Sequence, residues 1–320
     1  MHGVDETVGA IEGLAGSLLG VTEAAAVAAA AWVGRGQGEQ ADAAAVAAMR
    51  RAFAGLPLQA TVVIGEGEKD AAPMLYNGER LGRGGPELEL AVDPVEGTAL
   101  VAAGMPGGVS VLAAAPPGSL LRPGPSFYMD KLVVPPAAAD AVDPAAPLPE
   151  RLAQLGAALD RPVADLRVFV LDKPRHQQLV AGIRAAGARA CLAPAGDVLG
   201  GLMAALGERV DALMGVGGTP EGIITACMAR ALGAGMWASL APQSEDEARR
   251  LAEVDLGRGW MGREALAGRG EVLAVVTGIT GCALVGGVEA GAGGALELDS
   301  LVIGGGARLR RVRSRLAGTA

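Results

Sequence analysis

The sequence predicts an α/β protein in which helices and sheets pack in layers. Short apolar and β-branched runs alternate with longer Ala- and Leu-rich stretches along the chain, an order that is typical of layered α/β architecture. Hydrophobic residues make up 51% of the 320 residues, which is enough for a large core in one compact unit or two abutting domains. The 50 glycines and 19 prolines therefore indicate tight turns rather than disorder.

The first part of the chain is expected to alternate helices with short strands. The apolar stretch 4–33 predicts two helices that break near Gly20, with Thr22 as the cap of the second. A further helix is predicted over residues 42–53. The predicted strands are the apolar runs 60–64, 88–92, 108–115 and 131–134.

The second part of the chain is expected to form a separate domain. Residues 135–149 are rich in Pro, Ala and Asp and predict a linker. This linker would join an N-terminal α/β domain (1–135) to a C-terminal α/β domain (150–320). The basic tail 308–315 is expected to be a solvated surface segment. The predicted elements of this part are strands at 166–171, 188–192, 212–215 and 271–276, and helices at 177–186, 198–206 and 223–232.

Charge and composition argue against several classes of function. A net charge of −8 disfavours non-specific binding to nucleic acid or anionic membranes, and the apolar run 24–33 is too short to span a bilayer. Three widely spaced cysteines predict free thiols. No Lys or Arg precedes Arg35, so a secretory signal is not expected, and we expect a cytoplasmic protein. No Gly-x-Gly-x-x-Gly stands between a clear strand and a helix, which argues against NAD binding.

Acidic residues stand where predicted strands end and where one predicted helix begins. Open α/β sheets bind their ligands at such an edge. Carboxylates that converge there repel one another unless a cation lies among them, and Mg²⁺ and Mn²⁺ prefer oxygen ligands. With only two histidines in the chain, a His-rich zinc site is not expected. The acids are Asp42 at the helix start and Glu66, Glu68, Asp93, Glu96 and Glu221 after strands.

The hexapeptide 93–98 (DPVEGT) carries the sharpest signal of chemistry. Its proline holds Asp93 and Glu96 in a set relation, and Gly97 permits close approach of a substrate. Thr98 stands at the start of a predicted helix, where its hydroxyl can orient a water. The alternative interpretation is an ordinary polar turn between a strand and a helix.

Cationic and aromatic residues suggest how a phosphate would be bound. Lys173 and Arg175 are two residues apart after a predicted strand, so both can face one phosphate, which Arg can bind bidentately. Surface salt bridges are the alternative. His176 is interpreted either as a hydrogen-bonding partner of the site or as a structural residue. Tyr128 is one of two tyrosines and is either a substrate contact or a core residue.

On these motifs the chain resembles the class II bacterial fructose-1,6-bisphosphatases, a branch of the lithium-sensitive metal-dependent phosphatase superfamily. Glu96, at the fourth position of the hexapeptide, is typical of the class II branch. Further segments agree in the same order over nearly the whole chain. They are 64–68 (IGEGE), 72–75 (APML), 128–132 (YMDKL), 173–176 (KPRH), 196–198 (GDV), 217–222 (GGTPEG) and 277–280 (TGIT).

The resemblance implies a layered α-β-α-β-α sandwich of the sugar-phosphatase type. It implies a cytoplasmic enzyme of gluconeogenesis that hydrolyses fructose 1,6-bisphosphate to fructose 6-phosphate with Mn²⁺ or Mg²⁺, and that forms a homodimer or homotetramer. The implied metal ligands are Asp42, Glu66, Asp93, Glu96 and Glu221, most of them in the N-terminal domain. The implied catalytic residues are Thr98, Asp93 and Glu66. The implied substrate contacts are Glu96, Gly97, Thr98, Tyr128, Lys173, Arg175, Gly196, Asp197 and Gly218.

The chain departs from the family pattern on the substrate side. Gln37 and Gly38 stand where relatives carry Asp-Lys, and Ala195 replaces the first acid of Asp-Gly-Asp-Val. These changes leave two alternatives open. The protein would act on another sugar or cyclitol phosphate, such as sedoheptulose 1,7-bisphosphate or an inositol phosphate, or it would be a weakly catalytic sugar-phosphate-binding paralogue.

Overall fold

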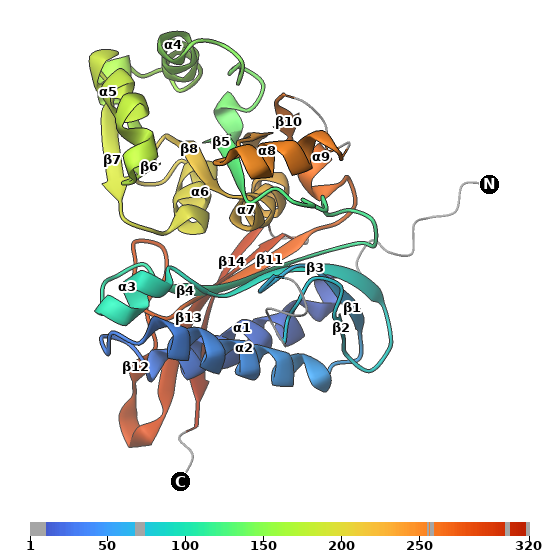
Figure 1. The fold of residues 1–320 in the computed structure, drawn as a ribbon. Helices are drawn as coiled ribbons and strands as arrows, with labels where there is room; N and C mark the ends of the chain where they lie inside the picture. The colour runs from blue at the N-terminus through green and yellow to red at the C-terminus, as the bar shows by residue number, and fades with distance from the viewer. Residues whose placement is uncertain (1–10, 68–73, 255, 257–258, 305–307, 318–320) are drawn as a thin grey trace, which may run out of the picture. The chain divides into compact units, whose positions relative to one another are not determined.

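The computed structural model describes residues 11–67, 74–254, 256, 259–304 and 308–317. The chain divides into two compact units, which are described separately here (Figure 1). Unit 1 consists of the chain up to Leu120 together with the chain from Arg269 onwards, and unit 2 consists of Leu121–Gly268.

These units differ from the predicted domains because the C-terminal strands return to the first sheet. The antiparallel pairing of β11 (Leu273–Gly278) with β4 (Val109–Ala115) brings the end of the chain into unit 1. The predicted linker 135–149 lies inside unit 2. Its Ala138 and Val142 are buried in the core of that unit, so the stretch packs as part of a domain.

Unit 1 is built on a mixed eight-stranded sheet. The strand order is β12-β13-β11-β4-β3-β1-β2, and β14 pairs with β13 at the edge. β1 and β3 are parallel, and the other pairs are antiparallel. The remaining strands of this sheet are β1 (Gln59–Ile64), β2 (Arg80–Leu81), β3 (Glu87–Glu96), β12 (Glu289–Ala290), β13 (Leu296–Gly304) and β14 (Leu309–Leu316).

Two long helices cover one face of this sheet, α1 (Ala15–Ala30) and α2 (Gly38–Ala54) (Figure 1). The predicted break at Gly20 is wrong, because α1 runs straight through it and buries residues at helical spacing on one side. Thr22 is no cap. Its hydroxyl donates to Leu19 O at 3.0 Å and lies 2.7 Å from Thr277 Oγ1. The shorter elements of unit 1 are η1 (Glu12–Leu14), α3 (Thr98–Ala103) and η5 (Ala292–Gly294).

One helical stretch of the described chain, Glu12–Ala30, has the length and hydropathy to cross a membrane. Half of its apolar window is buried inside the protein. It packs against α2, β4 and β11, so the core of unit 1 accounts for its hydropathy. This helical stretch is longer than the apolar run 24–33 of the sequence analysis, and it packs as a core helix.

The predicted start of α2 at Asp42 is wrong, because the helix begins at Gly38. Gly34 and Gly36 adopt φ of +72° and +69°, a left-handed turn that favours glycine and leads the chain directly into the helix. Asp42 therefore projects from the helix rather than capping it.

The strand predicted over residues 88–92 is longer than expected, because β3 continues through Asp93 to Glu96. The register against β4 shifts between Asp93 and Glu96, which marks a bulge. Pro94 lies in this bulge, where its missing N–H breaks no regular ladder bond. The two acids therefore lie in the last residues of a strand and not beyond it.

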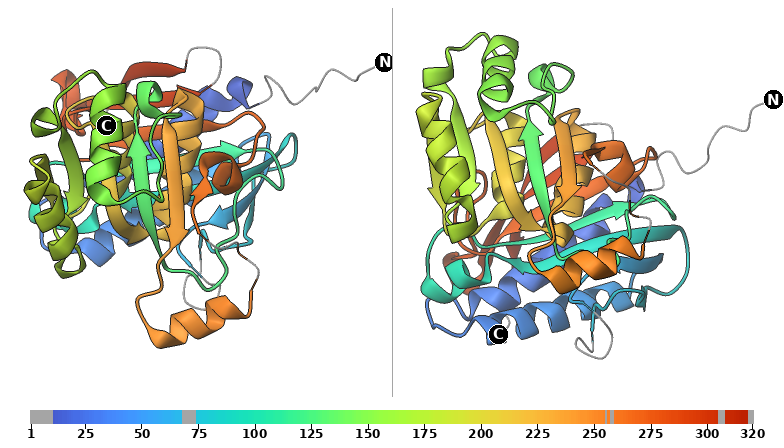
Figure 2. Two further views of the ribbon diagram at one scale, coloured as in Figure 1. Left: turned by 90° about the horizontal axis from the view of Figure 1, so that it is seen from above. Right: turned by 45° about the horizontal axis from the view of Figure 1, so that its top comes forward.

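Unit 2 is built on a mixed six-stranded sheet in the order β10-β9-β5-β8-β6-β7. β6 is parallel to both β7 and β8, and β5 lies between β8 and β9 (Figure 2). Its strands are β5 (Tyr128–Val134), β6 (Arg167–Leu171), β7 (Arg189–Ala193), β8 (Ala212–Gly218), β9 (Gly235–Leu240) and β10 (Met261–Gly262).

The helices of unit 2 alternate with these strands. They are α4 (Leu148–Ala158), α5 (Gln177–Ala185), α6 (Asp197–Leu206), α7 (Thr219–Leu232), α8 (Glu245–Ala252) and α9 (Arg263–Ala267), with η2 (Pro136–Ala138), η3 (Val163–Asp165) and η4 (Pro174–His176). Helices packed with two mixed sheets confirm the predicted α/β sandwich class.

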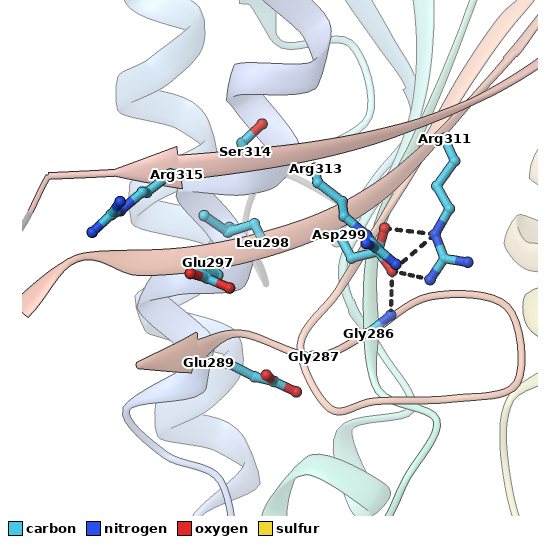
Figure 3. Close-up of a pocket in the computed structure, with 10 residues that line it drawn as sticks. All are labelled: Gly286, Gly287, Glu289, Glu297, Leu298, Asp299, Arg311, Arg313, Ser314 and Arg315. Atoms are coloured by element: carbon cyan, nitrogen blue, oxygen red, sulfur yellow. Dashed lines mark hydrogen bonds and ion pairs between the residues drawn. The ribbon is translucent and has the colours of Figure 1, made fainter. Parts of the chain in front are cut away.

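A charged hollow of about 410 Å³ lies on unit 1 between β12, β13 and β14 (Figure 3). The buried Asp299 accepts hydrogen bonds from Arg311 Nε at 2.9 Å and from Gly286 N at 2.7 Å. The hydrogen bonds from Arg311 lower the pKa of the Asp299 carboxyl. The basic tail predicted to be a solvated segment is therefore the edge strand β14, which still exposes Arg313 and Arg315.

Asp299→Asn should destabilise the protein at pH 7 by about 1–2 kcal/mol, because it removes a charged hydrogen-bond acceptor whose Arg partner is half exposed. The folded-state pKa of Asp299 lies below its ordinary value of 3.8. The stabilisation is thus complete above that value and disappears as the pH falls through the folded-state pKa. Urea unfolding at pH 7 and below pH 4 measures both effects.

The matched control for this prediction is Asp246→Asn, which removes two exposed ion pairs on α8, with Arg249 and Arg250, and should change stability by less than about 0.5 kcal/mol. Equal losses in the two variants at pH 7 would contradict the role assigned to Asp299.

Candidate active site

Two acids of unit 1 lie together at the end of β3. A carboxylate oxygen of Asp93 and one of Glu96 lie within 4.8 Å of each other. Asp93 Oδ1 accepts a hydrogen bond from Val95 N at 3.1 Å, which holds this carboxylate over the bulge. Glu96 is only 6% exposed. Two carboxylates at this separation, one of them buried, favour a bound cation.

Thr98 joins this acidic pair to α2. Its hydroxyl lies 3.0 Å from Asp42 Oδ1 and 3.0 Å from Val95 O, both of which can only accept. Gly97, directly before it, has φ +82° and begins α3, a backbone conformation that favours glycine. Burial raises the pKa of Asp42, and the charge of Glu39 adds to this, while the bond from Thr98 lowers it.

Gly38 provides the space that Thr98 occupies. A Cβ at this position would lie 2.9 Å from Thr98 Cγ2, and the two hydrogen bonds of the hydroxyl hold that methyl in place. Gly38 therefore leaves the space that the Thr98 methyl group fills.

Glu66 is a further acid of unit 1 whose pKa depends on its surroundings. It follows β1, and its N–H donates to Leu75 O at 2.9 Å. Burial, and next the charge of Asp42, raise the pKa of Glu66 to about 7. Glu68, the other acid predicted at this turn, lies outside the described residues. A divalent cation beside Glu66 and Asp42 would offset both effects.

In unit 2 β8 ends in two glycines, Gly217 and Gly218, which leave room for the side chains of Lys131, Asp197 and Glu221. A Cβ on Gly218 would overlap the carboxylate of Glu221, and one on Gly217 would lie 2.7 Å from Lys131 Nζ. Glu221 stands in the first turn of α7. In the described part of the chain its Oε2 is buried without a hydrogen-bond partner. An orphaned carboxylate oxygen of this kind fits a metal ligand.

Lys131 is a residue to which the sequence analysis assigned no role. It is 2% exposed on β5, forms an ion pair with Asp197, and donates to Gly218 O at 3.0 Å. Asp197, predicted to contact substrate, is the first residue of α6 and directly follows Gly196, which has φ +95°. Its carboxylate is thus held by a buried lysine of β5. A lysine directly before the apolar residues 132–134 of a predicted strand was the signal available in the sequence.

The two predicted phosphate-binding residues of unit 2, Lys173 and Arg175, lie in the turn after β6, and Arg175 contacts Tyr128 at the start of β5. The guanidinium of Arg175 lies 5.3 Å from the centre of the Tyr128 ring, a separation typical of a cation–π contact. Its Nε donates to Val216 O at 3.0 Å. Lys173 precedes η4 and is half-buried. Tyr128 and Gly218 are cross-strand partners of β5 and β8.

The structure therefore groups the predicted residues within each unit. In unit 1 it joins Asp42 with Thr98 and with Glu66, and it places Asp93 beside Glu96. In unit 2 the groups are Tyr128 with Arg175, and Asp197 with Lys131, Gly218 and Glu221.

Comparison with known proteins matches residues 12–316 to the family described as bacterial fructose-1,6-bisphosphatase, glpX-encoded. The chain belongs to this family. It is 39% identical over 311 residues to fructose-1,6-bisphosphatase 1 class 2 of Escherichia coli (strain K12), covering 92% of each chain. The class 2 enzyme of Shigella flexneri matches to the same extent. Family membership confirms the resemblance seen in the motifs and implies a metal-dependent phosphatase.

Gly217→Ala should destabilise unit 2 by about 1–3 kcal/mol, because the new methyl would overlap Asp197 and crowd Lys131, and neither buried partner can move freely. Thermal unfolding measures the effect. Gly20→Ala is the matched control. Its Cβ meets nothing within 4 Å, so it should stabilise α1 by about 0.5–1 kcal/mol. A neutral Gly217→Ala would contradict this packing argument.

Proposed function

We propose that this protein hydrolyses fructose 1,6-bisphosphate to fructose 6-phosphate and phosphate with Mn²⁺ or Mg²⁺. Membership of the class II family carries the proposal, since the relatives are named for this ester. The paired carboxylates of Asp93 and Glu96 support it, because crowded acids of this kind fit a hard cation. This ester is proposed in preference to sedoheptulose 1,7-bisphosphate or an inositol phosphate.

Three of the proposed metal ligands have carboxylate oxygens that a cation would stabilise. Glu66 has a raised pKa, Asp42 offers Oδ2 beside its bond to Thr98, and Glu221 has an orphaned buried oxygen. A divalent cation held there supplies charge neutralisation for the phosphoryl oxygens. The proposed ligand set is Asp42, Glu66, Asp93, Glu96 and Glu221.

The Thr98 hydroxyl is proposed to orient the attacking water. Its single proton points to Asp42 or to Val95 O, so its oxygen is left to accept a hydrogen bond from water. As the water oxygen bonds to phosphorus, its proton passes to Thr98, and the Thr98 proton passes to Asp42. Asp42 Oδ1, 3.0 Å from the Thr98 hydroxyl, is the carboxylate oxygen within reach of that proton. The bond from phosphorus to the sugar oxygen breaks, and this oxygen takes a proton from solvent.

The second phosphate is proposed to bind at the turn after β6. Within the described residues Arg175 donates its hydrogen bond through Nε, to Val216 O, which leaves its two terminal NH₂ groups for bidentate binding of a phosphate. Lys173 adds a second positive charge. Tyr128, Gly196, Asp197 and Gly218 complete the proposed contacts, together with the backbone of Glu96, Gly97 and Thr98.

We also propose, on the family resemblance, a cytoplasmic location, a place in gluconeogenesis and a homo-oligomeric state. The free thiols expected for such a protein agree with the three unpaired cysteines, Cys191, Cys227 and Cys282. A dimer or tetramer stays a prediction.

Purified protein should release phosphate from fructose 1,6-bisphosphate in the presence of Mn²⁺ or Mg²⁺, and chelator should abolish the release. Asp93→Ala should remove the metal stimulation, whereas Glu289→Ala, which changes an exposed acid on β12, should not. A colorimetric phosphate assay measures the release in each of these conditions. No release by the unmodified protein with either metal would overturn the proposed function.

Thr98→Ala should lower kcat by about 100-fold with KM within about threefold, since it removes a group that acts on the attacking water. Thr98→Ser keeps the hydroxyl and loses only the methyl seated on Gly38, so it should retain activity within about tenfold. Steady-state kinetics separate the two. Similar kcat values for Thr98→Ala and the unmodified protein would rule out this role.

A further inference from the structure

We propose that His176 is a positioning residue that holds the guanidinium of Arg175 ready for phosphate. The inference rests on the proposed function, which assigns Arg175 to the distal phosphate. His176 ends η4, directly after Arg175, and is only 3% exposed. Its ring is thus part of the interior of unit 2, while the neighbouring arginine is at the surface.

The hydrogen bonds of His176 define its tautomer. Val216 N–H lies 2.8 Å from Nε2, and an amide N–H can only donate, so Nε2 carries no proton. Nδ1 lies 2.6 Å from Leu171 O, and a carbonyl can only accept, so Nδ1 carries the proton. The ring is neutral and bridges the end of β6 to β8.

His176 and Arg175 together satisfy a backbone edge that β6 leaves uncovered. β6 pairs with β8 only at Ala212 and Leu213. Further along β8, Val216 donates its N–H to His176 and accepts at its C=O from Arg175 Nε at 3.0 Å. In a strand, both groups of one residue point to the same side, so the ring and the guanidinium take the place of the missing strand.

β8 has a glycine where the ring approaches. Gly215 has φ +122°, and a Cβ there would lie 2.9 Å from His176 Nε2. Any side chain at this position would both strain the backbone and displace the ring. The close approach of ring and strand is therefore built into the local sequence.

This arrangement orients Arg175 before any ligand arrives. One edge of its guanidinium is bonded to Val216 O, and one face lies over the Tyr128 ring. An exposed arginine otherwise samples many rotamers, and ordering it on binding costs affinity. His176 accepts a hydrogen bond from the Val216 N–H and so holds this residue. The carbonyl of Val216, which orients Arg175, therefore stays in place.

Two substitutions separate positioning from simple structural support. In His176→Asn the amide NH₂ lies where Nδ1 lies and still donates to Leu171 O, but no acceptor reaches Val216. In His176→Gln the amide oxygen reaches the place of Nε2 and accepts from Val216 N–H. We expect KM for fructose 1,6-bisphosphate to rise about tenfold in His176→Asn with kcat within about twofold, and to rise less than about threefold in His176→Gln.

Activity on p-nitrophenyl phosphate is the internal control, since this ester has no second phosphate for Arg175. Its kcat/KM should be the same in both variants and the unmodified protein. Unchanged KM for the bisphosphate in His176→Asn would overturn the proposal. A parallel loss of kcat/KM on both esters would also overturn it, because that pattern marks a purely structural residue.

The proposal and the proposed function fail in different ways. If the unmodified protein releases no phosphate from the bisphosphate, the proposed function fails. The ratio of bisphosphate Kd values of the two variants, measured by calorimetry, then still decides the role of His176. If His176→Asn does not fold, ¹⁵N-histidine NMR of His2→Gln protein reports on His176 alone, since the chain has two histidines. A protonated Nδ1 and bare Nε2 are expected, and the opposite tautomer would overturn the proposal.

Discussion

Crowding of carboxylates is the constraint on which the site in each unit depends. In unit 1 burial, and next the charge of Asp42, raise the pKa of Glu66 to about 7. The Thr98 hydroxyl donates a hydrogen bond to Asp42 and so stabilises part of its charge. In unit 2 the buried Lys131 lies beside Asp197. Burial raises the pKa of Glu221, whereas the charge of Lys131 lowers it. Among the described residues, Glu66 with its raised pKa and Glu221 with its buried, unbonded Oε2 are well suited to bind a cation.

Glycine makes this crowding possible. Gly38 leaves room for the Thr98 methyl, Gly215 for the His176 ring, and Gly217 for the ion pair of Asp197. Each of these positions would need a shift of a hydrogen-bonded partner to accept a side chain. A core with few aromatic rings and many small residues suits such close approaches, because the backbone itself forms one wall of each packing contact.

Much of the fold was predictable because local pattern and packing agree. The strands near Val109 and Arg167 and the helix beginning at Gln177 lie where their periodicity indicated. The break at Gly20 was predicted wrongly, because burial of one face of α1 outweighs the modest helix penalty of a single glycine. The linker was predicted wrongly because proline-rich composition does not reveal that Val142 packs in a core.

The sequence by itself determined the layered α/β class, the order of the acidic and cationic motifs, and the family to which the chain belongs. These follow from residue type and spacing, because the same local pattern sets the helices and strands and carries the motifs of the family. Only the tertiary structure decided that the C-terminal strands complete the first sheet, that Lys131 is buried against Asp197, and that His176 is bonded to Val216. Such contacts join residues distant in sequence, and they depend on strand pairing and close packing that no local pattern encodes.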